Sequence, residues 1–93
     1  MKVYTVIDIW EESFDRRGCW VANFSDVGEA RKCFFDHLHF HEPDIDDDTI
    51  GFGFTDCLTG SGFAYDGENG NGTLFVRTEE VKDKFNQGEM PWA

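Results

Sequence analysis

The sequence has no positive charge over almost half of its length. Between Lys32 and Arg77 run 44 consecutive residues without a lysine or an arginine, and nine carboxylates fall within that segment. The formal charge of the whole chain is −11. A field of one sign repels nucleic acid and anionic membranes and attracts basic protein surfaces. The sequence therefore argues against phosphate binding by this segment and predicts a positively charged partner.

Long apolar runs and paired cysteines are also absent. No run approaches the roughly 18 residues that a membrane-spanning helix needs, and the first residues begin a strand pattern without the features of a secretion signal. Three cysteines, Cys19, Cys33 and Cys57, are odd in number, widely spaced and without a Cys-x-x-Cys pair. Such cysteines predict reduced thiols and no disulfide framework. We therefore expect a cytoplasmic protein.

Phenylalanine is abundant. Ten of the 93 residues are Phe and 40% of the chain is apolar, which separates it from acidic disordered proteins. A chain of this length forms one domain that buries roughly 65% of the area its unfolded chain exposes. We assign residues 1–86 to a single domain and expect residues 87–93 to form a loose tail.

The hydrophobic pattern predicts a mixed α+β domain. Alternation with period two marks the strands, and Ser25 or Asp26 can cap a helix that Pro43 must end. Five carboxylates within residues 42–48 predict a solvated loop there. The expected elements are strands at 2–10 and 19–24, a helix at 26–38, strands at 49–55, 62–65 and 73–77, and a helix at 79–85. This order, β-β-α-β-β-β-α, gives one antiparallel sheet and two helices.

The three histidines are candidate metal ligands. If the helix reaches residue 41, then Cys33, His37 and His41 form an i, i+4, i+8 row that could bind Zn²⁺ or Ni²⁺. Alternatively, the histidines only line a helix end, where imidazole suits the negative end of the helix dipole. Because a second element offers no matching Cys or His pair, we expect no metal and no other cofactor.

Two further chemical motifs are incomplete. Asp44, Asp46 and Asp48 match the start of a calcium loop, but its sixth and twelfth positions are threonine instead of glycine and glutamate. The Gly-Ser-Gly triplet at residues 60–62 lacks the full Gly-x-Ser-x-Gly nucleophile elbow. We therefore expect a binding protein and not an enzyme.

The acidic segment is the predicted binding surface. Its loop of five acids lies between Phe40 and Phe52, and this combination of charge with aromatic rings resembles what a nucleic-acid channel binds. Alternatively, the acids only keep a Phe-rich domain soluble. Solubility alone, however, is usually achieved with surface charges of both signs. The candidate partner-binding residues are Glu42, Asp44, Asp46, Asp47, Asp48, Asp66 and Glu68.

An aromatic face of the N-terminal hairpin is the alternative interface. Tyr4, Trp10 and Trp20 share this face and give it more apolar area than a solvated surface normally carries. Either another element covers the face, or it is an interaction surface, most simply that of a homodimer.

A resemblance to known proteins extends the charge argument. The run Val3-Tyr4-Thr5-Val6, a second strand ending at Phe24-Ser25, and Glu29-Ala30 within a helix look like short phage or mobile-element proteins built as a hairpin and a capped helix. With its acid content, the chain resembles the acidic anti-CRISPR and anti-restriction proteins of phages. The resemblance covers about residues 3–35 and brings no catalytic residues. It implies nucleic-acid mimicry in the host cytoplasm: a stoichiometric inhibitor that occludes the basic nucleic-acid-binding surface of a host defence protein.

Overall fold

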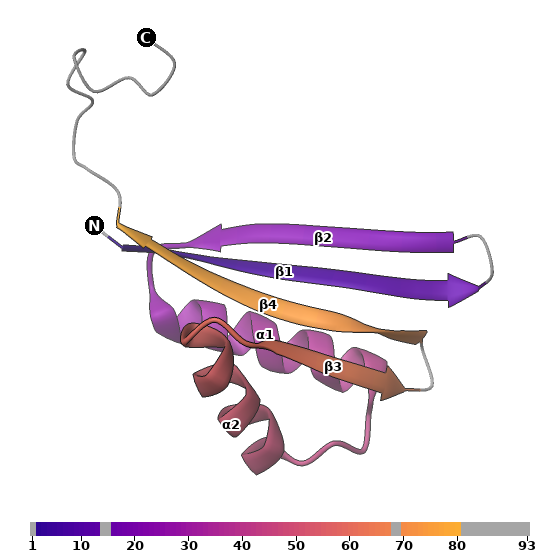
Figure 1. Ribbon diagram of the computed structural model, residues 1–93. Coiled ribbons are helices and arrows are strands. Elements are labelled where there is room, and N and C mark those ends of the chain that lie inside the picture. The colour runs from indigo at the N-terminus through magenta and orange to yellow at the C-terminus, as the bar shows by residue number, and fades with distance from the viewer. Residues whose placement is uncertain (1, 14–15, 68–69, 81–93) are drawn as a thin grey trace, which may run out of the picture.

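A computed structural model describes residues 2–13, 16–67 and 70–80. The elements in chain order are β1 (Lys2–Ser13), β2 (Arg16–Phe24), α1 (Val27–His41), α2 (Asp47–Leu58), β3 (Gly62–Gly67) and β4 (Gly70–Glu80). The four strands form one antiparallel sheet in the order β2-β1-β4-β3, and α1 and α2 lie together on one side of it (Figure 1). This arrangement confirms the α+β class with one antiparallel sheet and two helices.

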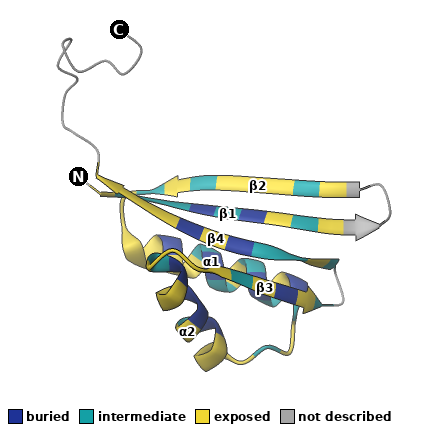
Figure 2. Cartoon of the chain, in the orientation of Figure 1, coloured by how far each residue is buried: buried dark blue, intermediate teal, exposed yellow. Residues whose placement is uncertain are grey.

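The alternation in β1 decides which face of the sheet is covered. Val6 and Asp8 point toward the helices and are fully buried, whereas Ile9 points the other way and is exposed. Because β1 pairs with β2 on one side and with β4 on the other, it forms the middle of the sheet together with β4. In Figure 2 the buried residues of β1 and β4 lie in the middle of these strands, where the helices cover the sheet.

Helix α1 is one turn longer at its end than the sequence pattern predicted. Asp26 caps its start, since the Asp26 side chain accepts a hydrogen bond from the Gly28 backbone N–H. Its buried stripe continues past Leu38 to His41, and the chain leaves the helix at the cap residue Glu42. The extra turn brings His41 over the sheet.

The prediction of a strand at residues 49–55 is wrong, because these residues lie in α2. Asp46 caps this helix by accepting hydrogen bonds from the backbone N–H and the hydroxyl of Thr49. Ile50 and Phe54 are buried at i, i+4 spacing, while Phe52 is 74% exposed. The apolar alternation of this segment therefore concealed the helical spacing of Ile50 and Phe54. The end of the predicted acidic loop, Asp47 and Asp48, forms the first turn of α2.

The prediction that a helix begins at Glu79 is also wrong. Glu79 and Glu80 belong to β4, where they pair with Val3 and Lys2 of β1. Thr78, which could cap a helix beginning at Glu79, instead pairs with Tyr4, because β1 extends back to Lys2 and continues the pairing with β4 to Glu80. The remainder of that predicted helix and the loose tail at residues 87–93 lie outside the described residues.

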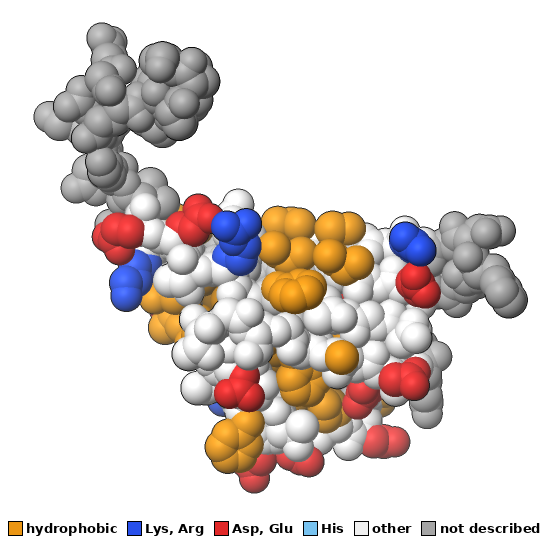
Figure 3. Space-filling model, in the orientation of Figure 1, with side chains coloured by type: hydrophobic (Ala, Val, Ile, Leu, Met, Phe, Trp, Pro, Cys, Tyr) orange, Lys and Arg blue, Asp and Glu red, His pale blue; other side chains and the backbone are white. Residues whose placement is uncertain are grey.

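The sheet face away from the helices carries apolar side chains. Ile9, Val21 and Phe75 are 46%, 53% and 36% exposed, and Ile7 pairs with both Val21 and Phe75. We call these four residues the open-face patch. Hydrophobic side chains are visible over the strands in Figure 3.

Two glycines of α2 should respond oppositely to alanine. A Cβ at Gly53 would overlap the Phe63 ring, whereas a Cβ at Gly51 would make only an ordinary contact, 3.5 Å from Arg31 Nη2. Gly51→Ala should raise the free energy of unfolding by up to about 1 kcal/mol through helix propensity. Gly53→Ala should lower it by about 1–3 kcal/mol through overpacking. Urea unfolding measures both, and equal effects would contradict the close packing of α2 on β3.

Candidate functional site

A buried carboxylate lies at the centre of the molecule. Asp8 of β1 is fully buried, and three side chains bind its two oxygens. His37 Nδ1 lies 2.8 Å and His41 Nε2 lies 3.0 Å from Asp8 Oδ2. The Tyr65 hydroxyl donates to Asp8 Oδ1 at 2.5 Å. We call Asp8, His37, His41 and Tyr65 the Asp8 centre.

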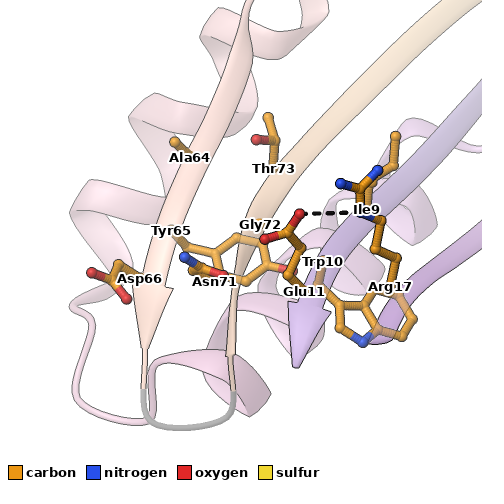
Figure 4. Close-up of a pocket in the computed structure, with 10 residues that line it drawn as sticks. All are labelled: Ile9, Trp10, Glu11, Arg17, Ala64, Tyr65, Asp66, Asn71, Gly72 and Thr73. Atoms are coloured by element: carbon orange, nitrogen blue, oxygen red, sulfur yellow. Dashed lines mark ion pairs between the residues drawn. The ribbon is translucent and has the colours of Figure 1, made fainter. Parts of the chain in front are cut away.

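Three elements bring these side chains together. His37 and His41 are four residues apart on α1, so both rings project from the same side of the helix. Tyr65 comes from β3 and crosses β4 to reach β1, passing over Gly72 (Figure 4). A Cβ at Gly72 would lie 2.6 Å from the Tyr65 hydroxyl oxygen. Glycine at this position is therefore what lets the phenol reach Asp8.

The hydrogen bonds keep the Asp8 carboxyl ionised. Burial raises its pKa, but the bonds from His37, Tyr65 and His41 together outweigh burial and hold the pKa below its ordinary value. Burial, and then the bond to Asp8, raise the pKa of the Tyr65 phenol far above its ordinary value. Tyr65 is therefore a protonated donor at neutral pH.

Aromatic rings surround the two histidines. The Trp20 ring lies 4.3 Å from the His37 ring between centroids, and Tyr65 stacks on His41 at 4.3 Å. The His37 side chain is 23% exposed, so solvent reaches one edge of the centre. Beside that edge is a pocket of about 300 Å³ lined by Asp8, Trp10, Trp20, Asp36, His37, Phe40 and His41.

The structure retains only part of the predicted Cys33-His37-His41 row. Within the described residues, the group whose ligand atoms lie within 4.8 Å of one another is Asp8, His37 and His41. Burial, followed by the charges of Asp36 and Asp8, raises the pKa of the Cys33 thiol to about 11. The sequence offered one signal for Asp8 that pattern reading missed: a carboxylate at an interior position of the apolar face of a strand.

The predicted partner-binding residues converge on the end of the domain where α1 stops. Glu42 Oε1 accepts a hydrogen bond from the Asp66 backbone N–H at 2.9 Å, which joins the loop to β3. The Asp46 side chain caps the start of α2. The His39 Nε2 atom lies 2.9 Å from Asp47 Oδ1. Glu68 lies outside the described residues. We call the described six the acidic end: Glu42, Asp44, Asp46, Asp47, Asp48 and Asp66.

This end also contains a groove, and none of its six carboxylates pairs with a lysine or arginine of the described residues. The groove, of about 510 Å³, is lined by residues 42–45, Asp66 and Gly67. Among the described ion pairs, those of lysine and arginine are Arg17–Glu11, Lys32–Asp36 and Arg77–Glu79. None of these pairs includes a carboxylate of the acidic end. Arg17 and Asp66 line one pocket at the end of the sheet, where Figure 4 shows Arg17 directed at Glu11.

The alternative aromatic interface lies mostly beneath α1. Tyr4 and Trp10 are partly buried and pack against the core, and Trp20 is 37% exposed beside His37. Helix α1 contacts both β1 and β2 on this side. The face of the sheet that the helices leave uncovered is the opposite one, which carries the open-face patch.

These features define an α+β domain with a buried carboxylate–histidine centre and an anionic end. No family model, curated protein or solved structure matches the chain. Neither helix of the described residues has the length and apolar character needed to cross a membrane.

Removing the Tyr65 hydroxyl should destabilise the fold in a pH-dependent way. Tyr65→Phe should lower the free energy of unfolding at pH 7 by about 1.5–3 kcal/mol, because it removes a hydrogen bond to a charged group. The native-state pKa of Asp8 is depressed, so the stability it supplies is present above its unfolded pKa of about 3.9 and is lost as the pH falls through the native value. Urea unfolding at pH 7 and at acidic pH measures the difference.

The variant should therefore differ less from the wild type in acid than at pH 7. Tyr4→Phe is the matched control, since Tyr4 does not bond to Asp8 and its variant should keep wild-type stability at both pH values. A Tyr65→Phe effect that does not change with pH would contradict an ionised Asp8.

Proposed function

We propose that the protein binds the basic surface of a nucleic-acid-handling protein through the acidic end. The observation that carries this proposal is the convergence of six carboxylates at one end with none of them paired to a described lysine or arginine. Their charge is therefore available to a partner. A nucleic-acid-binding groove offers a dense array of Lys and Arg side chains that ordinarily neutralise phosphates.

The acidic end is also preorganised. The Glu42 bond to the Asp66 backbone fixes the loop against β3, and the Asp46 cap fixes the first turn of α2. Asp44 and Asp48 are exposed on this fixed backbone. Because an ordered surface loses little conformational freedom on binding, its charges can contribute to affinity as well as to the association rate.

The resemblance to acidic anti-CRISPR and anti-restriction proteins supports a class of partner. In this proposal the protein is a stoichiometric inhibitor that competes with nucleic acid for a host defence protein. No catalytic step is involved, and the acidic end acts by occupying the groove.

Neutralising the acidic end tests the proposal. The triple change Asp44→Asn, Asp47→Asn and Asp48→Asn removes three charges and leaves the Asp46 cap in place. Wild-type protein immobilised at low salt should capture from a lysate proteins that duplex DNA elutes, and the triple variant should lose them. For a captured protein, the association rate constant should fall at least about tenfold as salt shortens the Debye length from about 10 to about 3 Å.

A control variant with the same change of charge separates the acidic end from net charge. It carries Glu29→Gln, Asp56→Asn and Glu79→Gln, three exposed acids outside the acidic end. The control should keep the captured proteins. Equal loss in both triple variants, or captured proteins that DNA does not release, would contradict the proposal.

A second candidate function, self-association, is favoured by the open-face patch. Val21 is 53% exposed within it and lies beside Ile7. If two copies bury this face, Val21→Lys should convert a dimer into a monomer in sedimentation velocity. Val27→Lys, at a 41% exposed valine at the start of α1, should leave the dimer intact. A wild-type monomer at all concentrations would exclude this function.

A further inference from the structure

We propose that Asp8, His37 and His41 bind a divalent first-row transition-metal ion, with an open coordination position facing the aromatic pocket. The proposal rests on the Asp8 centre alone and stands or falls independently of the acidic end. It assigns a ligand to the one polar cluster that the described core encloses.

The ligand atoms already have the spacing that a metal requires. His37 Nδ1 and His41 Nε2 lie 2.8 and 3.0 Å from Asp8 Oδ2, and all three groups offer atoms within 4.8 Å of one another. Bonds of about 2.0–2.2 Å to a shared ion place neighbouring ligand atoms about 3 Å apart. An ion can therefore replace the hydrogen bonds with little movement of α1 or β1.

The chemistry of the three ligands suits a transition metal. Two imidazoles and one carboxylate form the donor set of catalytic zinc sites and of non-haem iron sites, both of which keep positions open for other ligands. Asp8 is fully buried and His41 is 3% exposed, so the carboxylate charge is poorly solvated and attracts a cation strongly.

A surrounding shell holds these ligands in position. The Tyr65 hydroxyl occupies Asp8 Oδ1 and leaves Oδ2 for the metal. Tyr65 stacks on the His41 ring, and the Trp20 ring lies against His37. Such outer contacts orient the ligands and raise metal affinity.

The pocket gives the ion an exchangeable position. His37 is the ligand at the solvent edge, and the pocket of about 300 Å³ beside it has walls from Trp10, Trp20 and Phe40. Water or a small molecule with one ligating atom and an apolar body would fill the open position. This arrangement differs from a structural zinc site, where four protein ligands close the coordination sphere.

Titration with Zn²⁺ tests the site. Full-length protein treated with a chelator should bind one equivalent of Zn²⁺ in isothermal titration calorimetry. His37→Ala, at the part-exposed ligand, should keep the fold by circular dichroism and weaken binding at least about tenfold, since even outer-shell changes cost 10–100-fold. His39→Ala is the matched control because His39 lies on the same helix and contacts Asp47 instead of Asp8.

A measurement on the wild type alone guards against variants that fail to fold. X-ray absorption of the Zn²⁺-loaded protein should show only nitrogen and oxygen ligands, including two imidazoles. A sulfur ligand at about 2.3 Å would overturn the proposal and implicate a cysteine. Absence of a stoichiometric site, or equal weakening by His37→Ala and His39→Ala, would also overturn it and leave the Asp8 centre as a hydrogen-bond network of the core.

Discussion

The buried charge of Asp8 is the constraint on which the rest of the structure depends. An isolated carboxylate in a protein interior costs several kcal/mol, so its partners must be held in place by the fold. His37 and His41 tie β1 to α1, and Tyr65 ties β1 to β3 across the intervening strand. One side chain thus joins the middle of the sheet, its edge and the covering helix. Loss of one partner would leave the Asp8 carboxylate with fewer hydrogen bonds and would therefore destabilise the fold.

The same constraint positions the acidic end. Helix α1 must continue to residue 41 to supply its second histidine, and the next residue, Glu42, then bonds the Asp66 backbone at the end of β3. The two segments lie so close together here that a Cβ at Gly67 would overlap the His41 carbonyl, so this position requires glycine. The buried centre and the anionic surface are consecutive parts of one helix end. A change that shifts this end is therefore expected to affect both.

Local signals in the sequence predicted the N-terminal hairpin, the start of α1 and the hairpin of β3 and β4. They failed for α2 because Ile50, Phe52 and Phe54 alternate as a strand would. Two features separate the helix from that pattern: the cap at Asp46 and the helical spacing of the buried residues Ile50, Phe54 and Cys57. The Asp8 centre could not be predicted from local sequence patterns, because the partners of Asp8 lie 29, 33 and 57 residues away in the chain. The spacing within α1 marked His37 and His41 as candidate metal ligands, but the third proposed ligand, Asp8, depends on how the helix packs on the sheet.

Asp8 and the carboxylates of the acidic end differ in solvation, and this difference suits them to the two proposed roles. Exposed acids at the end of α1 act over a Debye length and attract any cation, whether a basic protein surface or a divalent ion. Long-range attraction alone gives little selectivity. Asp8 is desolvated and held by fixed donors, so it acts only at contact distance. An ion bound there must also suit coordination by two imidazoles. As proposed, the acidic end attracts positive species by its charge, and the Asp8 centre selects an ion by the ligands that it offers.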